Sequence, residues 1–284
     1  TWPVQLAPFS KTPNVGGEYK VWLSKSSSFP NSNSKKDNFK VAESITPPPG
    51  SCQPSSSLSV LVTGTNVVSY VPKGNWSATP VTGISVVTVE GSAVLPTTNP
   101  IPTTDVVNSC ASNALSGQTV WAANTNSTYV SSGQAAIPTV TTLLSAGTGT
   151  IGFSGGLCTN CGVAMDATHN KAVIGLSLAG VPGFQFLNLG SATFEPAFTS
   201  PAGAISEDPL LDPIRNLLLS ASELNNYEIV DVTTSTAPAF FENGPIALPG
   251  FGELDSSGED CTTGIALAPA EFSDPSAVYI ANLS

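Results

Sequence analysis

Two pairs of acidic residues are the strongest candidates for chemistry in this sequence. Glu207-Asp208 and Glu259-Asp260 each stand directly before an apolar segment that we predict to be an inner β-strand. Carboxylates at matching positions of successive repeats would converge at one end of the molecule. Such a cluster suits Ca²⁺, which takes about six to eight oxygen ligands. The alternative, which we favour, is that these acids cap the turns leading into the strands, as Asp and Glu beside Pro and Gly often do.

The cysteines offer a second candidate site, because Cys158 and Cys161 have the Cys-x-x-Cys spacing. Zinc needs a second pair of ligands that the chain lacks, and no His follows for covalent haem attachment. A redox-active pair would need a thioredoxin-like βαβ setting. We therefore expect a structural disulfide, either local or from this pair to Cys110 or Cys261, in an oxidising compartment. With Cys52 the total is five, and an odd count predicts at least one thiol outside any disulfide within the chain.

The remaining polar and aromatic candidates favour binding over catalysis. His169 is the only histidine and falls in a predicted turn at the opposite end from the acidic pairs, so we expect no Ser-His-Asp triad. The segment Gly147–Gly152 resembles a phosphate-binding glycine loop, but no helix follows it, and we interpret it as a loop between repeats. Trp76 lies in a predicted loop, where it would either stack on a sugar ring or fold back onto its own sheet.

The charge distribution excludes several classes of partner. The formal net charge is −11, and only 10% of the 284 residues are charged, against about 25% in ordinary globular proteins. Six of the lysines precede residue 41, and only Lys171 and Arg215 follow Lys73. Such a body repels nucleic acids and anionic membranes, whereas it attracts Ca²⁺ and basic partners. No apolar run is long enough for a membrane span, and the hydroxyl- and amide-rich composition indicates a protein that is secreted or held at the cell surface.

Short β-branched segments separated by Gly, Pro, Asn and Ser begin at residue 58 and continue along the chain. Runs such as Ile84–Val89 have the length and composition of strands. The one candidate helix, near Asp212–Leu219, contains Pro213, which argues for a strand, a turn and a second strand instead. Residues 1–57, with the Pro-rich stretch Thr46–Pro54, indicate an irregular strap or linker. We therefore predict an all-β chain.

An internal repeat organises these strands. Gly162–Gly175 aligns with Asp208–Ala221 at a spacing of 46 residues (212 − 166), and both contain an apolar strand, an Asp-x-x-x-Asn turn and a second apolar strand. Third strands follow at Phe184–Leu189 and Tyr227–Val232. Looser copies occur at Val67–Val71 with Ile84–Val89, at Cys110–Asn124, and at Gly264–Pro269 with Ala277–Ile280.

Four strands in every ~45–55 residues are typical of a β-propeller blade, which buries its faces by stacking against its neighbours. We predict a β-propeller of four-stranded blades over residues 58–284, preceded by the irregular strap at 1–57. About five repeats are visible, and the last one is incomplete. The predicted blades cover residues 58–103, 104–156, 157–203, 204–252 and 253–284.

The run Val163-Ala-Met-Asp-Ala-Thr-His-Asn-Lys-Ala-Val-Ile-Gly175 with Phe184–Leu189 resembles the blade repeat of YVTN/NHL-type β-propellers. The resemblance covers about residues 58–284, concerns architecture, and implies a ligand site at one mouth of the central channel. It implies no single activity, because such propellers include binding modules, adhesion and surface-layer proteins, lactonases and other hydrolases. They usually close with about six or seven blades, and an open ring exposes a sheet edge. We therefore expect that the chain continues beyond Ser284, or that residues 1–57 or a neighbouring subunit completes the ring.

The leading functional hypothesis is an exported, non-enzymatic scaffold or binding protein that takes part in a cell-surface or extracellular assembly. It rests on the lack of a catalytic histidine, a nucleophile motif and a cofactor loop. The first alternative is a Ca²⁺-dependent, lactonase-like hydrolase with Glu207, Asp208, Glu259 and Asp260 at the channel mouth. The second is a carbohydrate-binding propeller that uses Trp76. A protein or a glycan is the expected partner.

Overall fold

The structure is a computed structural model in which 25 strands and the turns between many of them are described. The described residues are 17–23, 35–41, 59–63, 66–72, 82–90, 93–96, 101–113, 115–132, 138–149, 151–153, 156–177, 183–200, 209–222, 226–241, 246–248, 254, 257–260, 263–270 and 278–283. None of the described elements is a helix long and apolar enough to cross a membrane.

Five antiparallel sheets, which we call blades 1 to 5, follow one another along the chain. Blade 1 contains β3 (Ser59–Thr63), β4 (Asn66–Pro72), β5 (Ile84–Glu90) and β6 (Ala93–Pro96). Blade 2 contains β7 (Val107–Ser112), β8 (Thr119–Ala123), β9 (Ser127–Ser131) and β10 (Val140–Leu144). Blade 3 contains β13 (Asn160–Asp166), β14 (Lys171–Leu176), β15 (Gly183–Asn188), β16 (Thr193–Phe194) and β17 (Phe198–Thr199).

Blades 4 and 5 complete the series. Blade 4 contains β18 (Leu210–Asp212), β19 (Leu217–Ser222), β20 (Asn226–Asp231), β21 (Ala239–Phe240) and β22 (Ile246–Ala247). Blade 5 contains β23 (Gly258–Asp260), β24 (Ile265–Pro269) and β25 (Val278–Asn282). Two separate hairpins are formed by β1 (Gly17–Leu23) with β2 (Lys35–Val41) and by β11 (Ile151–Phe153) with β12 (Gly156–Cys158).

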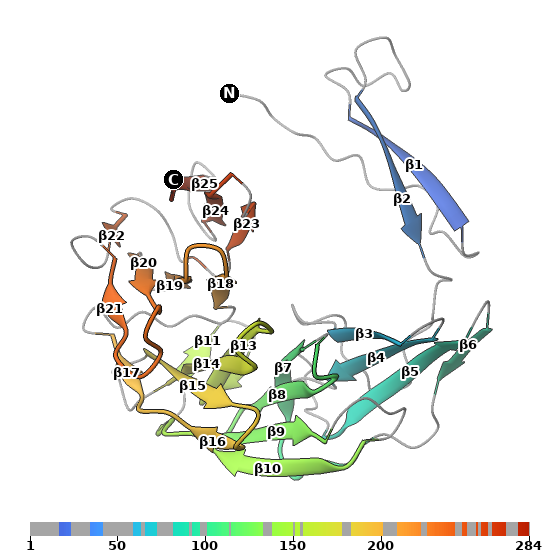
Figure 1. Ribbon diagram of the computed structural model, residues 1–284, viewed down its shortest axis with the longest axis horizontal. Coiled ribbons are helices and arrows are strands. Elements are labelled where there is room, and N and C mark those ends of the chain that lie inside the picture. Colours follow the sequence, from blue (N-terminus) through green and yellow to red (C-terminus); the bar gives the residue numbers. More distant parts are fainter. Residues whose placement is uncertain are drawn as a thin grey trace.

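The first strand of each blade is its inner strand. Contacts join β3 to β7, β7 to β13, β13 to β18, and β18 to β23, so these strands link the blades in chain order. Figure 1 shows the resulting arc, which runs from blade 1 through blades 2, 3 and 4 to blade 5. An all-β fold with four-stranded blades and a shorter last blade is therefore confirmed. The strand–turn–strand expected at Asp212–Leu219 is also present, as β18 and β19.

The core consists of apolar layers between neighbouring blades. Four clusters of buried residues lie between blades 1 and 2, 2 and 3, 3 and 4, and 4 and 5. Burial of one large apolar side chain contributes about 1.5–3 kcal/mol. Representative members of the four clusters are Trp121, Ile174, Phe186 and Leu219, each at most 2% exposed. Because each layer needs two sheets, a blade is stabilised mainly by the blade on either side of it.

Two sequence-based expectations are wrong. The strap at residues 1–57 is not wholly irregular, because β1 and β2 form an antiparallel hairpin with Gly17 opposite Val41. Its lysine-rich strands lack the β-branched runs on which strand prediction relied. In blade 5, Ile265–Pro269 is the second strand, not the inner strand. The inner strand is β23, whose short sequence Gly-Glu-Asp carries no apolar residue and so gave no strand signal.

Candidate functional site

The turns between the first and second strands share one design, although their sequences differ. In each of three blades an Asx side chain accepts hydrogen bonds from the turn backbone. Leu115 N–H donates to Oδ1 of Asn113 (2.8 Å), His169 N–H to Oδ1 of Asp166 (3.0 Å), and Ile214 N–H to Oδ1 of Asp212 (2.8 Å). The fifth residue of each turn has a positive φ, a conformation that Asn and Gly tolerate best. The φ values are 73° at Gly117, 52° at Asn170 and 55° at Asn216.

These inner turns are also tied to the turns of neighbouring blades. Nδ2 of Asn113 in blade 2 donates to Oδ1 of Asn170 in blade 3 (2.8 Å). The Lys171 ammonium of blade 3 bonds Glu195 and also Ser235 of blade 4. The inner turns of blades 2 and 3 are therefore joined directly, whereas Lys171, next to the inner turn of blade 3, is bonded to the β20–β21 turn of blade 4. We call the surface formed by described residues 115–117, 166–170 and 212–216 the turn face.

Large side chains project from the turn face. Leu115 is 77% exposed and Ile214 is 63% exposed. Their backbone N–H groups take part in the turn hydrogen bonds, but their side chains do not. Between them, on blade 3, the His169 side chain is 59% exposed, and its Nδ1 lies 2.7 Å from Oδ2 of Asp166. Exposed apolar residues on rigid turns are typical of interaction sites, because little conformational entropy is lost when they are covered.

A buried ionic cluster lies behind the turn face, between blades 4 and 5. The Asp212 side chain is 0% exposed, and its Oδ2 accepts a hydrogen bond from Nη1 of Arg215 (2.9 Å). Burial raises the pKa of Asp212, but hydrogen bonds from Arg215, from the turn backbone and with Glu259 outweigh burial and hold that pKa below its usual value. Arg215 in turn lies against Gly264, where an added Cβ would stand 2.6 Å from Nη2.

The structure corrects the predicted positions of Glu259 and Asp260. Asp260 pairs with Ile265 as Asp212 pairs with Leu217, so it ends an inner strand and does not precede one. The carbonyl of Gly264 accepts the N–H of Leu283, as that of Asn216 accepts the N–H of Val232. Glu259 and Asp260 therefore belong with the inner turns. They are not equivalent to Glu207 and Asp208, which lie outside the described residues.

The predicted Ca²⁺ site assumed that both acidic pairs precede an inner strand. That assumption does not hold for Glu259 and Asp260, which end one. No group of three or more His, Cys, Asp or Glu side chains with metal-binding geometry occurs among the described residues. Glu259 instead lies beside Asp212, where the two carboxyls can share a hydrogen bond only while one of them carries a proton.

At the other end of blade 2, Asp105 forms a polar site that sequence analysis missed. The Tyr129 hydroxyl donates to Oδ2 of Asp105 (2.8 Å) and lies 2.9 Å from Oγ1 of Thr104. Burial raises the pKa of Asp105, but hydrogen bonds from Tyr129, Ser127 and Thr104 lower it further than burial raises it. Asp105 precedes the inner strand β7, the position where ligand residues were expected. Nothing near it in the sequence marks it apart from other Asp residues in loops.

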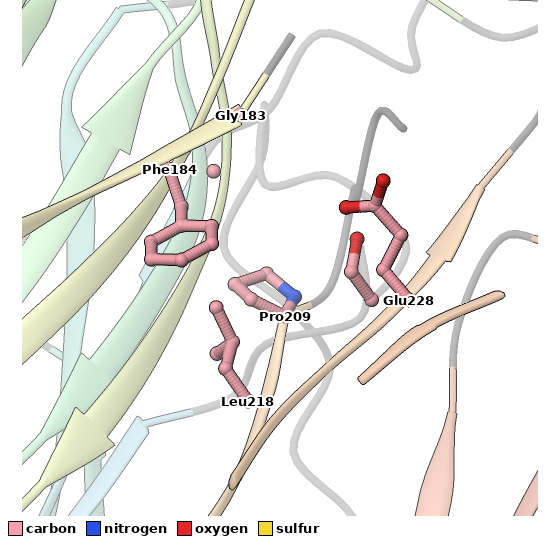
Figure 2. Close-up of a pocket in the computed structure, with 7 residues that line it drawn as sticks. Gly183, Phe184, Pro209, Leu218 and Glu228 are labelled. Carbon is pink, nitrogen blue, oxygen red and sulfur yellow. The ribbon is translucent and has the colours of Figure 1, made fainter. Parts of the chain in front are cut away.

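A second polar residue that sequence analysis missed is Glu228, in a crevice between blades 3 and 4. Figure 2 shows Phe184, Pro209 and Leu218 on one side of this crevice and Glu228 on the other. Glu228 is only 1% exposed, and burial raises the pKa of its carboxyl, although a hydrogen bond from Ser200 opposes the change. Ser200 lies in the segment that follows blade 3, so Glu228 fastens the connection between the two blades.

Gln185 has the same place in blade 3 that Glu228 has in blade 4. Gln185 pairs with Ile174, as Glu228 pairs with Ser220. Its Oε1 accepts the N–H of Ala146 from the segment that follows blade 2 (2.9 Å). Alignment of the two third strands would have revealed the Gln-to-Glu difference, although not that both side chains are buried. The position is structural, since in both blades it holds the incoming chain.

The structure describes the side chains of two of the four candidate cysteines, Cys161 and Cys110. Cys161 is buried and its sulfur belongs to a disulfide. Cys110 is a buried thiol outside any disulfide, so this candidate is wrong. It packs with Ile84 and Trp121 on the side of blade 2 that faces blade 1, whereas Cys161 is in blade 3. The side chains of Cys158 and Cys261 lie outside the described set, as does Trp76, and the disulfide partner and the sugar-stacking role stay predictions.

Sheets of this kind, joined through their inner strands around an arc, define a β-propeller. No family model and no curated protein sequence matches the chain. A β-propeller chain in a crystal structure of the mitotic checkpoint complex is similar, with a TM-score of 0.55 and 13% identity. That match covers 79% of this chain and 62% of the other, less than two thirds of its length. A chain in a crystal structure of a nidogen/laminin complex matches with a TM-score of 0.48 and 11% identity over 75% of each chain.

Proposed function

We propose that this chain is a non-enzymatic binding propeller that presents its turn face to a basic protein partner. The observation that carries the proposal is the exposure of Leu115 and Ile214, at 77% and 63%, on turns that are fixed by side-chain hydrogen bonds. Exposed apolar side chains on a rigid support favour binding, because covering them removes apolar area from water at a small cost in conformational entropy. The turn face spans blades 2, 3 and 4, a width that suits a folded protein surface or an extended peptide.

The charge of the chain supports a basic partner. Of its 20 acidic residues, 17 follow residue 73 (20 − 3), whereas only Lys171 and Arg215 carry positive charge in that part. Both cations are already engaged, Lys171 with Glu195 and Arg215 with Asp212. The field around blades 2 to 5 is therefore negative, and it would accelerate the approach of a basic partner.

We place the protein in an exported or cell-surface assembly. The low content of charged residues and the disulfide at Cys161 support this location. The YVTN/NHL-like repeat is part of the same proposal and rests on the residues quoted for it. Calcium-dependent hydrolysis is not favoured, because Glu259 and Asp260 end an inner strand, which is not the position from which the four acids were expected to converge.

Selection of random linear peptides on phage tests the proposed turn face. We expect peptides enriched on the wild-type chain to carry Lys or Arg, and to bind at least about tenfold more weakly to a Leu115→Ser/Ile214→Ser double variant. Leu144→Ser is the matched control, because Leu144 is 66% exposed but lies on β10, the outer strand of blade 2. Peptides that bind the double variant and the wild type equally, or a selection without enrichment, would exclude the turn face as the binding site.

A further inference from the structure

Blade 5 has an apolar face that no described residue covers. Leu267 is 43% exposed, Val278 is 54% exposed and Ile280 is 62% exposed. Leu267 pairs with Ile280, and Pro269 pairs with Val278, two positions further along the same two strands. Residues two apart in a strand lie on the same face of a sheet, so these side chains form one patch. We call it the outward face of blade 5.

The same positions are buried in blade 4. Ile265 pairs with Asn282 as Leu217 pairs with Asp231, and this match aligns the two sheets residue by residue. Leu267, Val278 and Ile280 then correspond to Leu219, Tyr227 and Ile229, which are 0%, 0% and 7% exposed. Those three residues are covered by Ala266, Ala268, Ala281 and Leu283 on the opposite face of blade 5.

The corresponding faces of the earlier blades follow the same rule. In blade 3 the outward side chains include Val173, Phe184 and Phe186, which pack with Leu218 and Val230 of blade 4. In blade 2 they include Val120 and Val130, which pack with blade 3. The outward face of blade 5 therefore continues a series of sheet-to-sheet interfaces, and its composition is that of a covered face.

The charge of this region limits what can cover it. Residues 253–284 contain six acidic residues (Glu253, Asp255, Glu259, Asp260, Glu271 and Asp274) and no Lys, Arg or His. Two copies of blade 5 packed face to face would bring twelve acids together, and like charges oppose such an association. A suitable occupant must be a β-structure with apolar positions on one side and positive charge.

The β1–β2 hairpin meets both conditions. Alternate register pairs combine Tyr19 with Phe39 and Val21 with Asp37, whereas Glu18 with Lys40 and Trp22 with Lys36 fall between them. The two strands contain four lysines and two acidic residues. A two-stranded hairpin is only marginally stable in water without a surface to pack on. Figure 1 shows the hairpin on the open side of the arc, above blade 1 and apart from blade 5.

We infer that the β1–β2 hairpin docks on the outward face of blade 5 of the same chain, over Leu267 and Ile280. The hairpin then takes the place that a following blade has at the other interfaces. Its lysines offset the negative charge of blade 5, and its apolar positions cover the exposed patch. This docking does not depend on the partner proposed for the turn face.

Hydrogen–deuterium exchange of the full chain tests the docking. In the wild type we expect the amides of Gly17–Leu23 and Lys35–Val41 to exchange at least about tenfold more slowly than in Ile280→Lys, because the added charge removes an apolar contact and repels the hairpin lysines. Leu144→Lys is the control, since Leu144 is 66% exposed on blade 2. It should leave hairpin exchange unchanged. Amides of β24 report whether blade 5 stays folded in each variant.

Three results would overturn the inference. Hairpin amides that exchange without protection in the wild type show that the hairpin is not docked. Protection that is equal in the wild type and in Ile280→Lys, with β24 protected in both, shows that it docks elsewhere. Protection that increases with protein concentration assigns the contact to a second copy. Faster hairpin exchange in high salt supports the docking, because salt screens the attraction between the lysines and blade 5.

Discussion

Blades 3 and 4 share a backbone frame but place different chemistry in it. Gln185 of blade 3 is replaced by Glu228 in blade 4, Phe184 by Tyr227, and the exposed His169 by Arg215. In blade 3 these positions are neutral or open to water. In blade 4 they place ionisable groups in buried sites, where desolvation is costly unless a partner is present. The comparison teaches that the turn and the strand register define the repeat, whereas the neighbouring blade determines which charges a repeat can hold.

Substitution of Arg215 should have the largest effect on the free energy of unfolding. Arg215→Met leaves Asp212 buried beside Glu259 without its cation, and we expect a loss of about 3 kcal/mol in the free energy of unfolding. His169→Ala in blade 3 should cost less than about 1 kcal/mol, because the His169 side chain is 59% exposed. Urea unfolding at neutral pH measures both. Equal losses in the two variants would contradict the contrast between the blades.

The same pair predicts a pH dependence in acid. Burial raises the pKa of Asp212, but Arg215 and the turn backbone hold it below its usual value. The stabilisation is then complete above the ordinary Asp pKa, and it is lost as pH falls through the lower value of the folded state. Arg215→Met should flatten this part of the stability curve, measured by urea unfolding at a series of acidic pH values.

Substitution of Glu228 should change the free energy of unfolding by an intermediate amount, and Glu228→Gln should raise it where Arg215→Met lowers it. Burial raises the pKa of Glu228, so its contribution is most favourable below the ordinary Glu pKa and declines as pH rises through the folded value. Glu228→Gln should therefore stabilise the chain at neutral pH by on the order of 1 kcal/mol and remove this decline. Gln185→Glu should introduce a similar decline in blade 3. Thermal melts of both variants at acidic and neutral pH test this. An effect of Glu228→Gln that does not depend on pH would contradict the prediction.

Tyr227→Phe should have the smallest effect on the free energy of unfolding near neutral pH. Burial, together with the charges of Glu259 and Tyr279, raises the pKa of Tyr227 to about 12. Its stabilising contribution is complete below the ordinary Tyr pKa of about 10 and is lost as pH rises toward 12. Tyr227→Phe copies the residue of blade 3 and should remove this alkaline decline. Tyrosinate absorbance followed from neutral to alkaline pH measures it, and a Tyr227 that ionises near its ordinary pKa would contradict the prediction.

The repeat could be predicted where strands were apolar and turns carried an Asx residue. Asp166 and Asp212, each four residues before an Asn, aligned blades 3 and 4 correctly because the side chain and the positive φ impose one turn. The same rule extended to Asn113 with Gly117. It failed at β23, because Glu259 and Asp260 were mistaken for loop residues. The partners of Glu259 and of Asn113 belong to another blade, and no pattern within one repeat predicts a contact between two.

Gly264 makes the repeats of this chain unequal as building units. Its counterparts in blades 3 and 4 are Asn170 and Asn216, but the guanidinium of Arg215 occupies the place that a Cβ at Gly264 would take, 2.6 Å from Nη2. A blade with Asn at that position could follow blade 4 only if the Arg215 guanidinium, the flexible end of its side chain, shifted. Blade 5 is therefore matched to blade 4. Duplication or shuffling of whole repeats would need a side-chain adjustment at that junction.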